Sequence, residues 1–143
     1  MRNLEVSKEL LSEVLNLKVV SHGLLNKLNN SFDITYMPLE DDQYTRSMPI
    51  DINDFFFMCK EWATSKNYQI ISGLLNNTVF SKHDEKSYAK INYYTEDKIG
   101  NREYKGMYII ANTEIEAVIK ACEYALKEIN ELHAHIQLVR EVF

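Results

Sequence analysis

Apolar residues recur at helical spacing in three stretches of the chain, and each stretch follows a residue that can cap a helix. Ser7 precedes the first stretch, Asp51 the second and Thr113 the third, and the side-chain oxygen of each can accept a hydrogen bond from an amide of the first turn. Glu116 follows Thr113 at the spacing of a capping box. The pattern therefore predicts three amphipathic helices, and the apolar stripe of the last one is almost uninterrupted.

Between the first two helices, the sequence predicts a β-hairpin and then a polar loop. Segments 18–25 and 31–39 are joined by asparagines, which tolerate turn conformations, and apolar and polar residues alternate in the second segment. We expect Pro38 to end that strand. Segment 39–49 is polar and acidic, and we expect it to form a loop.

Three runs rich in tyrosine, isoleucine and valine lie between the second and third helices, in segments 68–82, 86–97 and 103–113. The gaps between these runs are too short for crossover helices, so the strands are expected to pair antiparallel. The elements together predict an α+β fold in which an antiparallel β-sheet of about four to five strands is packed on one face by about three helices. Their order is roughly α-β-β-α-β-β-β-α, and the length of the chain fits a single domain over residues 1–143.

Alternation in segment 86–97 divides its residues between the two sides of a strand. Ala89, Ile91 and Tyr93 fall on one side, and we expect Ala89 and Ile91 to face the helices. Tyr88 and Tyr94 fall on the other side. Tyrosine suits a half-exposed face or an interface, because its ring is apolar and its hydroxyl can stay in contact with water.

Segment 133–143 is a candidate C-terminal extension. It could continue the last helix, kink, or leave the domain to meet a partner. Val139 and Phe143 lie at apolar positions of this segment, and Phe57 and Met58 lie off the main stripe of the second helix. If these four side chains are exposed, they favour a homodimer.

The two cysteines of the chain, Cys59 and Cys122, each lie on the apolar stripe of a predicted helix. Glu61 and Glu123 follow them closely but project away, because residues one or two apart do not share a helix face. A reactive thiol needs an electropositive and partly exposed setting. We therefore expect both cysteines to be core residues that take no part in a disulfide framework.

The formal net charge of −5 changes the range of partners to be considered. It argues against a nucleic-acid binder that works by bulk charge, so a nucleic-acid partner is not expected. The N-terminal segment spreads charged residues among its apolar ones, and this pattern indicates neither a signal peptide nor a membrane span. We expect a cytoplasmic protein with no membrane partner.

No motif indicates a catalytic, cofactor-binding or metal-binding site. The sequence contains no phosphate-binding glycine loop, no dinucleotide fingerprint and no nucleophile elbow. His133 and His135 would diverge by about 200° on a helix, which disfavours a metal pair. Glu40, Asp41 and Asp42 lie in a loop without the glycine that a calcium site usually needs. We therefore expect no catalytic, cofactor-binding or metal-binding residues and no cofactor.

Binding to another protein is the first functional hypothesis, because the sequence offers surface features and no catalytic constellation. The acidic loop could dock a basic surface, and the strand tyrosines and the apolar tail could add contacts. The candidate interaction surface consists of Glu40, Asp41, Asp42, Tyr44, Tyr88, Tyr94, Val139 and Phe143.

Two other classes of function remain open. The first is a single-stranded nucleic-acid or nucleotide binder, in which strand tyrosines stack on bases. The second is a small enzyme with an unfamiliar site, which would gather His22, His83 or His133 with carboxylates in a polar pocket. The tyrosines considered for stacking are Tyr88, Tyr93, Tyr94, Tyr104 and Tyr108.

Three blocks of the sequence carry a resemblance: KELLSEVL at 8–15, IDINDFFFMCKEWA at 50–63 and TEIEAVIKACEY at 113–124. In content and order they resemble a family of small phage and prophage proteins. The resemblance implies a non-enzymatic accessory protein that binds a host protein in the bacterial cytoplasm, for example an inhibitor of a defence nuclease such as an anti-CRISPR. The family supplies no catalytic residue to carry over.

Overall fold

The computed structural model describes residues 4–38, 44–75, 87–96 and 99–142, and within these ranges it describes the side chains at all positions except 133 and 135–142. The described residues form three helices and two antiparallel sheets, which confirms the α+β class. The elements in chain order are β1 (Glu5–Val6), α1 (Lys8–Leu15), β2 (Lys18–Val19), β3 (Gly23–Asn26), β4 (Ser31–Met37), β5 (Arg46–Asp51), α2 (Ile52–Ser65), β6 (Gln69–Leu74), β7 (Ser87–Glu96), β8 (Arg102–Ala111) and α3 (Glu114–Val142).

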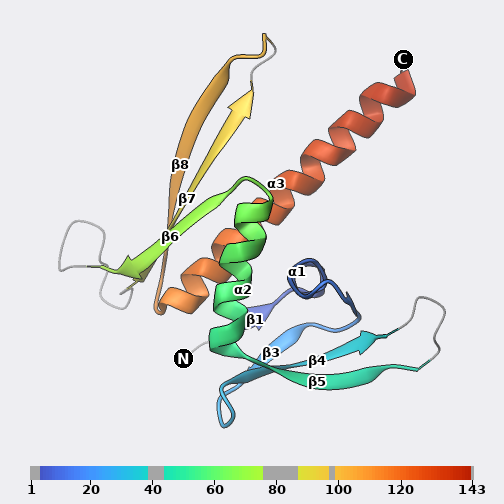
Figure 1. Cartoon of the computed structure of the whole chain (residues 1–143), viewed down its shortest axis with the longest axis vertical. Coiled ribbons are helices and arrows are strands. Elements are labelled where there is room, and N and C mark those ends of the chain that lie inside the picture. Colours follow the sequence, from blue (N-terminus) through green and yellow to red (C-terminus); the bar gives the residue numbers. More distant parts are fainter. Residues whose placement is uncertain (1–3, 39–43, 76–86, 97–98, 143) are drawn as a thin grey trace.

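The strands divide between two sheets, where the sequence led us to expect one. The first has the order β1-β3-β4-β2, with β5 paired to β4, and the second has the order β6-β7-β8. Helix α2 connects them and packs against α3 (Figure 1). Its 14 residues span about 21 Å, and the strand that follows it, β6, pairs with β7 of the second sheet.

The helix starts follow the capping residues of the sequence. The Ser7 hydroxyl accepts a hydrogen bond from the Leu10 amide at 3.1 Å, and the Thr113 hydroxyl accepts one from the Glu116 amide at 3.2 Å. The Asp51 carboxylate accepts from two amides of the first turn of α2. Asn67, just beyond the end of α2, has a φ of 67°, which asparagine tolerates better than most residues.

Helix α3 is the longest element, and its backbone remains helical from Glu114 to Val142. Of the three courses left open for segment 133–143, the chain therefore takes the continuous helix as far as Val142. Its 29 residues span about 43 Å, and the C-terminal half extends away from the rest of the molecule (Figure 1).

The first sheet differs from the sequence prediction in its edge strands. Residues 46–51 form β5, although segment 39–49 was expected to be a loop. Met48 and Ile50 are half-buried and alternate with exposed neighbours, and Pro49 fits there because β5 pairs on one side only, where an edge strand can lack a backbone N–H. Strand β1 has two residues, and segment 18–25 contains two short strands in place of one.

The core contains residues from both sheets and all three helices. Phe32 of β4 and Phe55 of α2 are fully buried, and their ring centroids lie 5.6 Å apart in an edge-on arrangement. Cys59 and Cys122 are also fully buried, which confirms their placement in the core. The hydrogen bond with Cys122 and burial raise the pKa of the Cys59 thiol far above its ordinary value, so it stays protonated.

Candidate functional site

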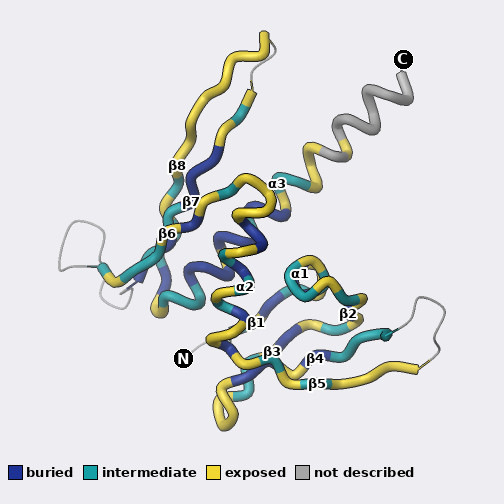
Figure 2. The backbone as a smooth tube through the Cα atoms, viewed as in Figure 1, coloured by how far each residue is buried: buried dark blue, intermediate teal, exposed yellow. Residues whose placement is uncertain are grey.

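The two faces of β7 have different environments. Ala89 and Ile91 are fully buried and Tyr93 nearly so, on the face that packs against α3, as the alternation predicted. Tyr88 and Tyr94 project from the opposite face, and Tyr94 is 64% exposed. Figure 2 shows that the middle of β7 is buried, whereas the first half of β8 is exposed.

Strand register adds two further tyrosines to that outer face. Tyr104 of β8 lies opposite Tyr94, with ring centroids 5.2 Å apart, and Tyr108 lies opposite Lys90. The Lys90 ammonium lies 5.4 Å from the centroid of the Tyr108 ring, which is a cation–π contact. Tyr104 and Tyr108 are each more than half exposed. We call this surface the tyrosine face, and it consists of Tyr88, Lys90, Asn92, Tyr94, Tyr104 and Tyr108.

Asn92 lies at the centre of the tyrosine face and is only 5% exposed. Its Nδ2 donates a long hydrogen bond of 3.5 Å to Gln69 Oε1, while its Oδ1 has no hydrogen-bond partner among the residues that the structure describes. Gly106 lies opposite on β8, and a methyl group there would come within 3.0 Å of Asn92 Oδ1. The absence of a side chain at position 106 therefore makes room for the amide.

A cavity of about 420 Å³ opens beside Asn92. It lies at the first residue of β6, Gln69, which pairs with Asn92, and β7 extends past this pair. Its lining is neutral and combines amide, hydroxyl and aromatic groups. The lining residues are Thr64, Asn67, Tyr68, Gln69, Asn92, Tyr94 and Tyr104.

On the inner side of the same sheet, three tyrosine hydroxyls surround the Glu128 carboxylate of α3. Tyr124 donates to it at 2.5 Å, and Tyr68 and Tyr93 donate at 3.5 Å. The hydrogen bond to Glu128 raises the pKa of Tyr124 above its ordinary range. Burial, followed by the charge of Glu128, raises the pKa of Tyr68 to about 12. These hydroxyls therefore act as donors that tie β7 and the start of β6 to α3.

We expect the Tyr68 hydroxyl to make stability depend on pH in the alkaline range. Its pKa is higher in the folded protein, so its contribution is complete below the ordinary value of 10.0 and is lost as the pH rises through about 12. Urea unfolding between pH 9.5 and 11.5 should therefore show a smaller loss of stability in Tyr68→Phe than in the wild type. Equal losses in the two proteins would exclude Tyr68 as the group responsible.

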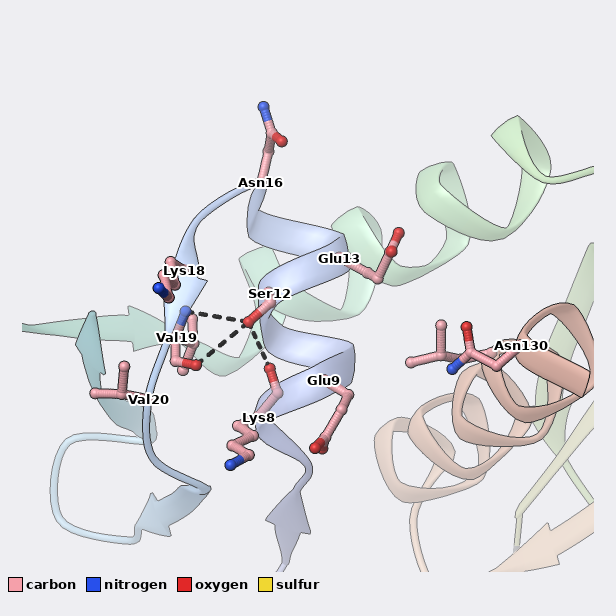
Figure 3. A pocket seen from close by; sticks show the side chains of 10 residues that line it. Lys8, Glu9, Ser12, Glu13, Asn16, Lys18, Val19, Val20 and Asn130 are labelled. Carbon is pink, nitrogen blue, oxygen red and sulfur yellow. Dashed lines mark hydrogen bonds between the residues drawn. The ribbon is translucent and has the colours of Figure 1, made fainter. Parts of the chain in front are cut away.

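A larger hollow of about 550 Å³ lies between α1, β2 and α3 (Figure 3). The Ser12 hydroxyl in it donates to the Lys8 carbonyl at 2.7 Å and accepts from the Val19 amide at 3.1 Å, so it is occupied in closing the turn from α1 to β2. The side chains of Glu9 and Glu13 do not converge on a common point in Figure 3. This hollow is therefore a weaker candidate than the tyrosine face.

The structure does not bring all the predicted surface residues together. Tyr44 is 78% exposed and precedes β5 of the other sheet. The backbone of Val139 belongs to α3, and its side chain lies outside the described residues. The remaining predicted positions, Glu40, Asp41, Asp42 and Phe143, also lie outside the described part of the chain.

The histidines considered for an enzyme do not assemble a site in the parts of the chain that the structure describes. His22 is exposed, and its Nδ1 lies 3.7 Å from Glu5. His83 and the side chain of His133 lie outside those parts. Within residues 4–38, 44–75, 87–96 and 99–132, no group of three or more histidine, cysteine or acidic side chains is arranged to hold a metal ion.

Comparison with protein-family models, with curated proteins and with solved structures finds no match to this chain. None of the helices, over the residues described, has both the length and the apolar character that crossing a membrane requires. The geometry of the tyrosine face is therefore the main basis for a functional proposal.

Proposed function

We propose that this protein acts by binding another protein through the tyrosine face. The observation that carries the proposal is the group of exposed rings on β7 and β8, in which Tyr94, Tyr104 and Tyr108 are each more than half exposed. Tyrosine is enriched at protein interfaces, and a rigid sheet holds such rings in place at little entropic cost. The three-stranded sheet therefore supplies a preformed surface for a partner.

The charge of the chain favours a protein partner over nucleic acid. The net charge is −5, and Lys90 is the single cation among the residues that define the tyrosine face. Binding to nucleic acid draws most of its affinity from cations that neutralise phosphates. The exposed rings alone would support stacking on bases, but the phosphates between those bases would find little positive charge here.

We further propose that the partner is a host protein and that the effect is inhibition, as the resemblance to phage and prophage proteins implies. This part of the proposal rests on the three sequence blocks at 8–15, 50–63 and 113–124. A non-enzymatic mode of action is supported by the chemistry of the described side chains. Both thiols are fully buried, and His22 is exposed beside a single carboxylate.

Site-specific photo-crosslinking tests the proposed function. A photoreactive phenylalanine analogue is placed at Tyr104 and, in a matched control, at Leu28, which is 96% exposed in the turn between β3 and β4. In host cells, we expect a defined protein adduct from position 104 and none from position 28. The double variant Tyr94→Ala/Tyr104→Ala should bind the captured protein at least about tenfold more weakly than the wild type.

Three results would contradict the proposal. They are adducts at both positions alike, no protein adduct at position 104, or an adduct at 104 that consists of nucleic acid. Leu28→Ala serves as the second control, since this exposed side chain lies in a turn of the first sheet, away from the tyrosine face, and its removal should leave affinity unchanged.

A further inference from the structure

We propose that Asn92, Tyr94 and Tyr104 form a subsite for the guanidinium group of an arginine on the partner protein. This inference rests on the proposed function, because the arginine belongs to the protein that binds the tyrosine face. The subsite is the neutral cavity of about 420 Å³ where β6 begins beside β7.

The first argument is the unpaired oxygen of Asn92. A buried carbonyl oxygen without a donor is unfavourable, and nearly all such groups in folded proteins have a partner. Asn92 is only 5% exposed, and no residue in the described part of the chain supplies a donor to its Oδ1. The oxygen therefore suits a hydrogen-bond donor supplied by a ligand. Gln69 and Asn67 also line the cavity, and Gln69 Oε1 already accepts from Asn92 Nδ2.

The second argument is the aromatic wall. Tyr94 and Tyr104 stand edge to face at the cavity, and their rings can hold a cation above a π face. The tyrosine face already contains such a contact, because the Lys90 ammonium lies over the Tyr108 ring. A planar guanidinium can stack on a tyrosine ring while its N–H groups reach amide oxygens in the ring's vicinity, which the compact ammonium of lysine does less well.

The third argument is charge. Among the described residues, the cavity lining contains no basic or acidic side chain, so it supplies no charge that would bind a phosphate. The chain as a whole carries a net charge of −5, which favours the approach of a basic partner. An arginine side chain satisfies all three conditions: it donates hydrogen bonds, it stacks, and it is positively charged.

Access to the Asn92 oxygen requires a small rearrangement of Lys90. A methyl group on Gly106 would lie 3.0 Å from Asn92 Oδ1 and 3.2 Å from Lys90 Cε, so the oxygen and the Lys90 side chain border the same space above Gly106. This chain is flexible and only half-buried. Lys90→Met shortens this side chain and removes its positive charge. It should therefore ease access to the oxygen and strengthen guanidinium binding.

Titration of the full isotope-labelled chain with Nα-acetyl-L-arginine methylamide, followed by amide NMR, tests the subsite. We expect saturable shifts centred on Gln69, Asn92, Tyr94 and Tyr104, with a dissociation constant in the millimolar range. The citrulline analogue has the same shape without the charge and should bind about tenfold more weakly. The lysine analogue and adenosine serve as the competing probes, and both should bind more weakly than arginine.

Two variants separate binding from folding. Asn92→Val removes the unpaired oxygen and should keep the fold while weakening arginine binding about tenfold. Tyr104→Leu retains apolar area without a π face at an exposed position, and it should also weaken binding. Wild-type affinity in both variants, no saturable shift at the cavity, or tighter binding of adenosine would overturn the subsite. If arginine fails while position 104 still crosslinks a protein, this inference falls and the proposed function stands.

Discussion

Replacing Phe55 with alanine is expected to lower the free energy of unfolding by about 3–5 kcal/mol. Phe55 is fully buried on α2, and its ring meets the edge of Phe32 from the first sheet. Truncation removes both the transfer free energy of the ring and its packing, and it leaves a cavity at the junction between helix and sheet. Urea unfolding followed by circular dichroism would measure the loss as a lower midpoint at nearly unchanged slope.

Phe57→Ala is the matched control for this prediction. Phe57 lies two residues away on the same helix, but it is 62% exposed, and its ring centroid lies 5.4 Å from that of Phe56. Its loss should cost at most about 1 kcal/mol, in keeping with other surface truncations. Similar costs for the two variants would contradict the division of α2 into a buried and an exposed face.

Ser7→Ala is expected to lower the free energy of unfolding by about 2–3 kcal/mol, which is large for a single hydroxyl. The hydroxyl has two partners: it accepts from the Leu10 amide at 3.1 Å and donates to Glu123 Oε1 at 2.7 Å. Loss of the N-cap bond costs about 1 kcal/mol, and loss of the bond to a charged carboxylate adds about 1.5–3 kcal/mol, reduced here by partial exposure.

A double-mutant cycle with Glu123→Gln separates these two contributions. A coupling energy of about 0.5 kcal/mol or more between Ser7 and Glu123 would show that the bond across the two helices matters beyond the cap itself. Ser47→Ala is the control, because this exposed hydroxyl makes one long contact of 3.4 Å to Thr35 and its removal should change stability by about 0.5 kcal/mol or less. Additive losses at Ser7 and Glu123 would refute the coupling.

Local features of the fold could be predicted from the sequence, because they depend on neighbouring residues. The capping residues Ser7, Asp51 and Thr113 mark the helix starts. Alternation along β7 identified its buried face correctly. In each case a side chain acts on backbone within a few residues, so the information lies within a short window of sequence.

Long-range pairing was harder to predict. Strand β5 contains Pro49 and polar residues, and only its pairing with β4 makes it a strand. The division into two sheets depends on which strand β6 pairs with after α2, and no local sequence pattern encodes that pairing. The candidate site has the same origin, since Tyr104 lies beside Tyr94 because of the register of β7 and β8. The unpaired oxygen of Asn92 can be recognised only once its neighbours are in place.

Helix α3 reaches both halves of the molecule with side chains that lie close together in sequence. Glu123 accepts a hydrogen bond from the Ser7 hydroxyl, which caps α1. Glu128 lies five residues later and about 140° around the helix, and it accepts hydrogen bonds from the hydroxyls of Tyr68 and Tyr93. The two sheets share no strand pair among the described residues. The segment of α3 from Glu123 to Glu128, little more than one helical turn, thus helps to set the angle between the tyrosine face and the first sheet. Substitutions in this segment could change affinity for a partner without altering any residue that contacts it.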